Sequence, residues 1–147
     1  MVNSYQNHIE LEISCAEPLE LVVMLYTGLL GSIRDARRQL AADDIAGRQR
    51  SVSKALAIVG ELTSALDLDR GGEMAARLHQ LYSFIADRLV DGSYRQMDQP
   101  LAEAEAVATT LLEAWTAIRP TATTAAAMPV HAGVAAFAGT ASLSVRG

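Results

Sequence analysis

The sequence contains few aromatic residues and a single cysteine. Two Phe, four Tyr and one Trp occur among 147 residues, and β-branched residues are outnumbered by Ala and Leu, which are strong helix formers. This composition favours an all-α protein. Because Cys15 has no second cysteine to pair with, an internal disulfide is excluded, and the chain fits a reducing compartment.

Positive charge is also scarce. Seventeen acidic residues outnumber twelve basic ones, which gives a formal net charge of -5. A field of this sign repels nucleic acid and anionic membrane surfaces, so we expect neither as a partner. Proteins are the expected partners. The basic cluster Arg34, Arg37 and Arg38 is interpreted as a solvated helix face.

No apolar run is long enough to span a membrane. The longest run, residues 19–30, is interrupted by Glu20, Thr27 and Gly28, whereas a spanning helix needs about 20 apolar residues. Residues 1–14 carry neither the positively charged start nor the unbroken apolar core of a secretory signal. We therefore expect a soluble cytoplasmic protein without direct membrane insertion.

Apolar residues recur at alternating spacings of three and four in four stretches of the chain, which predicts four amphipathic helices. The expected spans are about 18–40, 45–66, 73–92 and 101–118. The second helix is expected to follow Asp43 or Asp44 as its N-cap, and residues 68–72 are expected to form a turn before the third. The predicted buried stripes are Val22, Tyr26, Leu29, Ile33, Ala36 and Leu40; Ile45, Val52, Leu56, Val59, Leu62 and Leu66; Met74, Leu78, Leu81, Ile85 and Leu89; and Leu101, Ala104, Ala108, Leu111, Trp115 and Ile118.

Four helices of this length joined by short loops pack most simply as an antiparallel up-down four-helix bundle. We expect this domain to span residues 17–119. Residues 1–16 show no helical period and are expected to form an extended N-terminal segment. Residues 120–147 are a low-complexity stretch of Ala, Thr, Gly and Pro, and they carry too little large apolar surface to offset ordering entropy, so a disordered tail is expected.

No set of residues suits catalysis or metal binding. The predicted core stripes are almost wholly apolar, whereas an active site needs convergent polar groups. His8, His79 and His131 are scattered, and neither of the first two follows a carboxylate by three residues as in two-metal bundles. Gly71-Gly72 lacks the preceding strand and the following lysine of a phosphate loop. We expect no enzyme, no cofactor and no metal.

His79 leaves an alternative function open. A histidine on a helical bundle can carry phosphate in a signalling module, where a Lys and a Gly typically follow it. Leu81, Tyr82 and Ser83 stand near those positions here. A boundary residue of the third helix is the simpler interpretation. The alternatives are thus a histidine phosphotransfer-type signalling bundle and a helical adaptor for an assembly regulator.

The apolar surface exceeds what one bundle core is expected to bury. The first helix is apolar nearly all round over residues 21–26, and the third carries apolar residues on more than one face over 81–85. Flanking segments could cover this surface, or a partner helix could lie in an apolar groove there. A wide core with scattered exposed apolar groups explains the same pattern equally well.

Ordered motifs along the chain carry a family resemblance. Residues 17–28 read EPLELVVMLYTG, and Gly71-Gly72-Glu73 is followed by Leu78, Leu81-Tyr82 and Arg88-Leu89. Further matches are Lys54-Ala55, Ile58-Val59, Glu61-Leu62 and Ala114-Trp115. In order and spacing these motifs resemble the flagellar secretion chaperones, the FliS family, over about residues 4–118.

The resemblance implies a non-enzymatic cytoplasmic export chaperone. Members of this family bind the C-terminal segment of flagellin, prevent its premature polymerisation and assist its delivery to the flagellar type III export apparatus. Binding of this kind couples the folding of a flexible segment to its docking on a preformed apolar groove. Export-gate components and flagellar assembly regulators are further partners that the resemblance suggests.

The expected flagellin-binding groove lies on the second and third helices. Tyr82 is the best single candidate, because a phenol can keep one end wet while its ring packs against a client. By the resemblance, Tyr5 and Ile9 form an N-terminal lid over the empty groove, although a fixed cap on the bundle explains them nearly as well. Some groove candidates must instead be core; the full set is Leu56, Val59, Leu78, Leu81, Tyr82 and Ile85.

Overall fold

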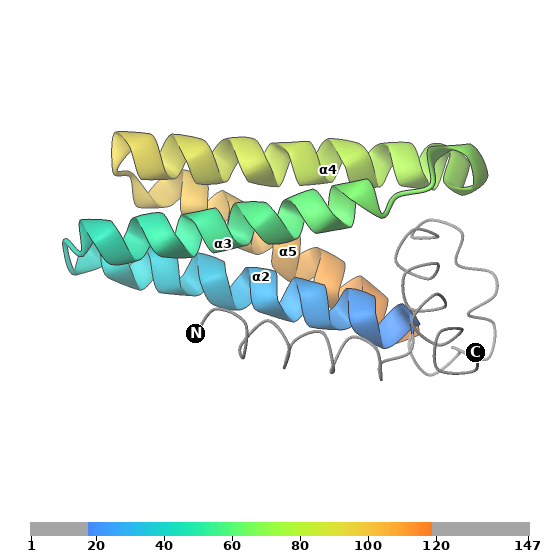
Figure 1. Cartoon of the computed structure of the whole chain (residues 1–147), viewed down its shortest axis with the longest axis horizontal. Helices are drawn as coiled ribbons and strands as arrows, with labels where there is room; N and C mark the ends of the chain where they lie inside the picture. The colour runs from blue at the N-terminus through green and yellow to red at the C-terminus, as the bar shows by residue number, and fades with distance from the viewer. Residues whose placement is uncertain (1–17, 119–147) are drawn as a thin grey trace, which may run out of the picture.

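The computed structural model describes residues 18–118, which form four α-helices (Figure 1). These helices are α2 (Pro18–Ala41), α3 (Ile45–Ser64), α4 (Leu68–Arg95) and α5 (Asp98–Ile118). Consecutive helices run in opposite directions, so that α2 begins and α5 ends at the same end of the bundle. Both α2 and α4 pack against α3 and α5, and the helices therefore close a ring. The predicted all-α four-helix bundle is confirmed.

The flanking segments predicted from the sequence lie outside the described residues. This applies to the N-terminal segment 1–16, with its lid residues Tyr5 and Ile9, and to the tail 120–147. Predictions about these segments stay predictions.

The start of α3 confirms one of the two predicted caps. The Asp44 carboxylate accepts a hydrogen bond from the backbone N–H of Gly47 at 2.9 Å, which satisfies one of the N–H groups left free at a helix start. Asp43 precedes it in the left-handed region, with φ of 56°. Asp tolerates this conformation better than most residues.

The segment predicted as a turn, residues 68–72, forms one helical turn at the start of α4, set off from the rest of the helix by a non-helical Gly72. α4 begins at Leu68, because the Asp67 carboxylate accepts hydrogen bonds from the backbone N–H groups of Asp69 and Arg70 at 3.1 and 3.0 Å. The helix then kinks at Gly72, where φ is 56° and ψ is −135°. Only glycine adopts this conformation readily, so Gly72 separates this first turn from the main part of α4.

α4 also continues one turn beyond its predicted end at Gly92. It stops at Gln96, which is left-handed with φ of 57°, and the backbone N–H of Met97 donates to the Gly92 carbonyl at 3.0 Å. Gly92 itself lies against α5, since a Cβ atom there would come within 2.8 Å of the Leu101 side chain. This glycine permits a close approach of two helices.

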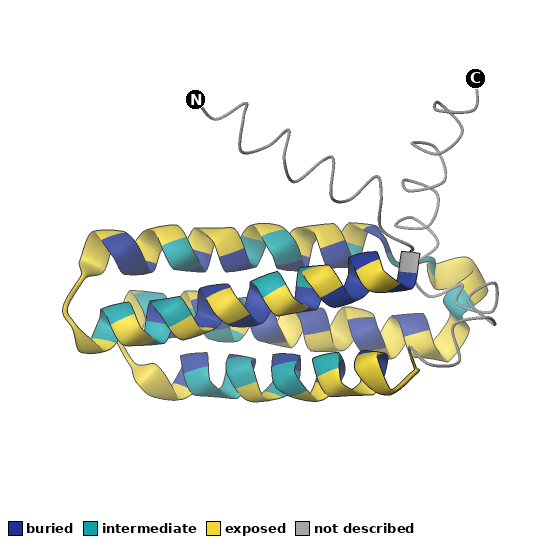
Figure 2. Ribbon diagram, turned by 90° about the horizontal axis from the view of Figure 1, so that it is seen from below, coloured by how far each residue is buried: buried dark blue, intermediate teal, exposed yellow. Residues whose placement is uncertain are grey.

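The buried side chains recur as bands along each helix, as Figure 2 shows in dark blue. Most of the predicted stripe residues are buried or partly buried, and Ile45, Met74, Leu81 and Ile118 are the exposed exceptions. On α4 the buried face is made of Ala75, Leu78, Tyr82, Ile85, Leu89 and Gly92. Met74 and Leu81 lie at the edge of this face. The apolar pattern of α4 is wider than the face that the core buries, so the residues at its edge stay exposed.

Candidate binding surfaces

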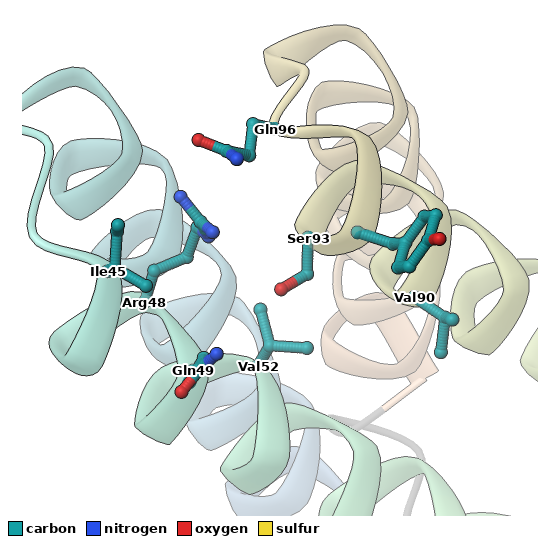
Figure 3. Close-up of a pocket in the computed structure, with 8 residues that line it drawn as sticks. Ile45, Arg48, Gln49, Val52, Val90, Ser93 and Gln96 are labelled. Atoms are coloured by element: carbon teal, nitrogen blue, oxygen red, sulfur yellow. The ribbon is translucent and has the colours of Figure 1, made fainter.

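A groove lies between the start of α3 and the end of α4. These two helices contact each other less extensively than the other neighbouring pairs, and the space between them has a volume of about 420 Å³. Figure 3 shows side chains from both helices around it. We call it the α3–α4 groove, lined by Ile45, Arg48, Gln49, Val52, Val90, Ser93, Tyr94 and Gln96.

Three large apolar or aromatic side chains of the α3–α4 groove are accessible to solvent. Ile45 is 51 % exposed, Val90 53 % and Tyr94 86 %. Val90 and Tyr94 are four residues apart and so share one side of α4. An apolar strip of this kind can be covered by one face of an amphipathic partner helix. None of these residues was among the predicted groove residues, although Ile45 was placed in a core stripe.

A buried cation also lines the α3–α4 groove. Arg48 is only 4 % exposed, and its Nε atom has no hydrogen-bond acceptor in the structure. In Figure 3 the guanidinium points into the space between the helices, opposite Ser93 and Gln96. The groove is therefore apolar at its rim and positively charged within.

Leu56 is the predicted site residue that continues this groove. It is partly buried against the core, and it lies seven residues after Gln49 and four after Val52, which places it on the same flank of α3. Val59 and Leu78 are buried between their helices. Leu56 thus lies on the flank of α3 that lines the groove, whereas Val59 and Leu78 are core residues further along the two helices.

Leu81 lies on the opposite flank of α4. It precedes Arg88 by seven residues, which places both on one flank, and Arg88 pairs with Glu103 of α5 at 3.6 Å. The Arg88 guanidinium also lies over the Phe84 ring, 5.9 Å from its centroid. Leu81 and Phe84 are exposed, and together they form a second apolar surface, the Leu81–Phe84 flank, on the side of α5.

Tyr82 and Ile85 are fully buried. The Tyr82 hydroxyl is hydrogen-bonded to that of Tyr26 on α2, and the indole N–H of Trp115 on α5 donates to the Tyr26 hydroxyl at 3.2 Å. The expectation that the Tyr82 phenol keeps one end wet is therefore wrong. A buried phenol that finds a polar partner inside the core holds helices together instead.

Burial governs the ionisation of these two phenols. Desolvation raises the pKa of Tyr26 to about 12, although its hydrogen bonds with Tyr82 and Trp115 oppose the rise. Burial raises the pKa of Tyr82 as well, and the neighbouring Tyr26 adds to the effect. Both phenols are neutral at physiological pH, and the cluster serves the fold rather than acid–base chemistry.

The arginine cluster on α2 lies on a solvent-exposed face, as predicted, and two of its members are also paired with carboxylates of α5. Arg37 donates from Nε and Nη2 to the Asp98 carboxylate at 2.7 and 2.8 Å, and from Nη1 to Glu105 at 2.7 Å. Arg34 donates to Glu105 at 2.9 Å. Among residues 18–118, Arg38 pairs only with Asp35 of its own helix. We call the contacts of Arg34 and Arg37 with Asp98 and Glu105 the α2–α5 clamp.

Catalytic and metal sites find no support in residues 18–118. No group of three or more His, Cys, Asp or Glu residues is placed to hold a metal ion within this range. His79 is exposed on α4. None of the four helices described is long and apolar enough to cross a membrane.

Comparison with known proteins gives one consistent result. A family model described as "Flagellar protein FliS" matches residues 1–122, which include all four helices. The chain is 32 % identical over 116 residues to the flagellar secretion chaperone FliS of Salmonella typhimurium, covering 78 % of this chain and 86 % of that protein. It is 33 % identical over 113 residues to FliSB of Pseudomonas aeruginosa, covering 77 % and 90 %. With FliS of Bacillus subtilis it shares 32 % identity over 113 residues, covering 77 % and 84 %.

Proposed function

The chain belongs to the FliS family of flagellar proteins, and from this premise we propose that it is a chaperone for flagellin export. It binds the C-terminal segment of flagellin, prevents premature polymerisation and assists delivery to the flagellar type III export apparatus. The relatives from all three organisms are named flagellar secretion chaperones. Since a client must be held before it is exported, the chaperone acts in the cytoplasm. The work is binding and release, which needs no catalytic group.

The observation that carries the choice of site is the exposed apolar rim of the α3–α4 groove. Ile45, Val90 and Tyr94 come from two helices and face solvent around one cavity. A flexible client segment that becomes helical there covers these side chains with its own apolar face. The ordering entropy of the client opposes binding, which keeps the complex releasable.

The predicted site residues take different parts in this proposal. Leu56 extends the apolar strip along α3, and Val59 and Leu78 contribute to the core that holds α3 and α4. Tyr82 and Ile85 act on binding only through the packing of α4. The lid residues Tyr5 and Ile9 remain proposed to cover the groove when no client is bound, as the sequence resemblance implies.

The test uses the full chain and a synthetic C-terminal segment of flagellin. We expect micromolar binding by calorimetry and a gain of helical circular dichroism on mixing. Tyr94→Ser weakens this binding about tenfold or more, because it removes an aromatic anchor from the groove. Phe84→Ser is the matched control, since it removes an exposed aromatic side chain from the other flank of the same helix.

Two results contradict the proposal. The first is the absence of both binding at micromolar concentrations and any gain in helicity. The second is equal loss of binding in the two serine variants, which would place the client elsewhere on α4.

Export-gate components and assembly regulators remain proposed further partners. For an export-gate component the Leu81–Phe84 flank is the proposed contact, because it stays free when a client fills the α3–α4 groove. Binding of the purified component to the chaperone, measured with the client segment at a saturating concentration, should survive Tyr94→Ser and be lost in Phe84→Ser. The reverse pattern would assign both partners to one surface.

A further inference from the structure

Arg48 is the only charged side chain that is buried within residues 18–118. The next least exposed arginines, whose side chains are 35 % and 30 % exposed, are paired: Arg37 with two carboxylates of α5, and Arg88 with Asp91 and Glu103. Arg48 has no such pair in the described part of the chain, and its Nε atom lacks any acceptor. The acidic residue one turn before it, Asp44, is engaged in capping Gly47.

The Nε atom of this guanidinium lies out of water without an acceptor, which is unfavourable for folding. Removing its water costs free energy that only an acceptor or a counter-charge returns. An apolar side chain of the same length would fill the space beside Val52 at no such cost. The stability of the free protein therefore gives no reason for an arginine at this position, and a bound partner that supplies the missing acceptor does.

The lining of the groove indicates the chemistry of that partner. Gln49, Ser93 and Gln96 are neutral, and none of the groove residues is acidic. The planar guanidinium presents N–H groups in a fork that fits a carboxylate. Next to it, Ile45, Val90 and Tyr94 form an exposed rim that apolar side chains of the partner would cover.

We propose that the α3–α4 groove accepts a client helix that places one Asp or Glu side chain against Arg48, with apolar residues one turn to either side. This inference rests on the proposed function, because the client is the C-terminal segment of flagellin. Arg48 then works as a specificity anchor. A helix with the same apolar face but no carboxylate at that position leaves the guanidinium buried and unpaired, and it is rejected.

Because the chain is negatively charged overall, the proposed contact with Arg48 acts only at short range. With a net charge of -5 the chaperone does not attract acidic clients at long range. A buried pair is screened by salt much less than a surface pair. The contribution of Arg48 to affinity is therefore expected to persist at high ionic strength, which separates it from a diffuse surface attraction.

The experiment compares Arg48→Met with wild type in the full chain. Methionine keeps an unbranched apolar side chain and removes the charge. We expect a melting temperature equal to or above that of wild type, together with an affinity for the flagellin segment that is about tenfold lower. Arg50→Met is the matched control, because Arg50 is exposed on the same helix; it should change neither quantity. The segment is amidated at its C-terminus, so that only side-chain carboxylates can contribute.

The client side of the contact is tested by replacing each Asp or Glu of the segment with its amide. At one position the replacement should weaken binding to wild type about tenfold and have no further effect on Arg48→Met, since the two groups form one pair. This loss should be the same in low and high salt.

The outcomes separate two failures. If the wild-type chain does not bind the segment, the proposed chaperone function fails and this inference fails with it. If wild type binds but no amide replacement weakens the complex, the function stands and the carboxylate anchor is overturned, whatever the stability of the Arg48 variant. If the loss of affinity from Arg48→Met and the loss from the amide replacement add up for every segment, the two groups do not form a pair, and the carboxylate anchor is overturned as well.

Discussion

The hydroxyls of Tyr26 and Tyr82 are hydrogen-bonded to each other inside the bundle, although 56 residues separate them in the chain. Their rings lie 6.2 Å apart, and the Trp115 ring stacks 6.4 Å from that of Tyr26. Each of the three residues belongs to a motif that resembles the FliS family. The motifs that identify the family therefore meet in the core, where they fasten α2, α4 and α5 together.

Replacement of Tyr82 tests this structural role. Tyr82→Ala should lower the free energy of unfolding by about 3–5 kcal/mol, because it leaves a large cavity in the core. Tyr82→Phe removes only the hydroxyl and should cost about 1 kcal/mol. Urea denaturation followed by circular dichroism measures both. An alanine variant as stable as wild type would show that the side chain is not part of the core.

Alkaline pH should unfold the protein through the same pair. The pKa of Tyr26 is raised from 10.0 to about 12 in the folded chain, and that of Tyr82 is raised too. The folded state thus favours the neutral phenols, so their contribution is complete below pH 10.0 and is lost as pH rises through the folded values. We expect tyrosinate absorbance from these two residues to appear together with loss of helix. Ionisation of both with the helices intact would contradict the burial.

Acid should weaken the α2–α5 clamp. Hydrogen bonds from Arg37 lower the pKa of Asp98. Burial raises the pKa of Glu105, but hydrogen bonds from Arg37 and Arg34 outweigh it and the net shift is downward. Groups with lowered pKa values stabilise the fold above their ordinary values of 3.8 and 4.5, and this contribution is lost as pH falls through the folded values.

The clamp is tested by Arg37→Met. Because the pairs are partly exposed, the loss at neutral pH should be about 1 kcal/mol or less. The melting temperature of the variant should fall less steeply than that of wild type below about pH 4.5. Arg38→Met is the control, since among the residues that the structure describes Arg38 pairs only within α2, and its acid profile should match wild type.

Two glycine variants test how closely α4 approaches α5. Gly92→Ala places a methyl group against the buried Leu101, and it should destabilise the bundle by about 1–3 kcal/mol through overpacking. Gly60→Ala is the counterpart, because nothing lies within 4 Å of its added Cβ. That variant should gain about 0.5–1 kcal/mol from better helix propensity. Thermal unfolding of both proteins would reveal the opposite signs, and a stable Gly92→Ala would refute the tight contact.

The helices could be predicted from the sequence because their signals are local. Spacings of three and four residues gave all four spans to within a few residues, and Asp44 was one of two predicted caps. The difference at residues 68–72 has a physical reason. A glycine pair is typical of turns, but the Asp67 cap starts a helical turn before the pair, and Gly72 interrupts the helix after that turn.

The binding surface was harder to predict, since it depends on which flank of a helix faces which neighbour. Spacing placed Leu81 near the core stripe of α4, but only the contact between Arg88 and Glu103 shows that this flank faces α5. Tyr82 looked suitable for a wet groove because its buried partner, Tyr26, is remote in sequence. Arg48 carried no signal at all, because an arginine on a helix is ordinarily solvated.

The ring of helices is completed by the last of them, and this has a consequence for synthesis. Tyr26 and Arg37 on α2 find their partners Trp115 and Glu105 only on α5. A ribosome produces these partners after α2, α3 and α4 have already been made, so the part of α2 that packs against α5 stays uncovered until the final helix is synthesised. The nascent chaperone therefore exposes part of an amphipathic helix before its own folding is complete. In its function it later covers the same kind of exposed helix in another protein.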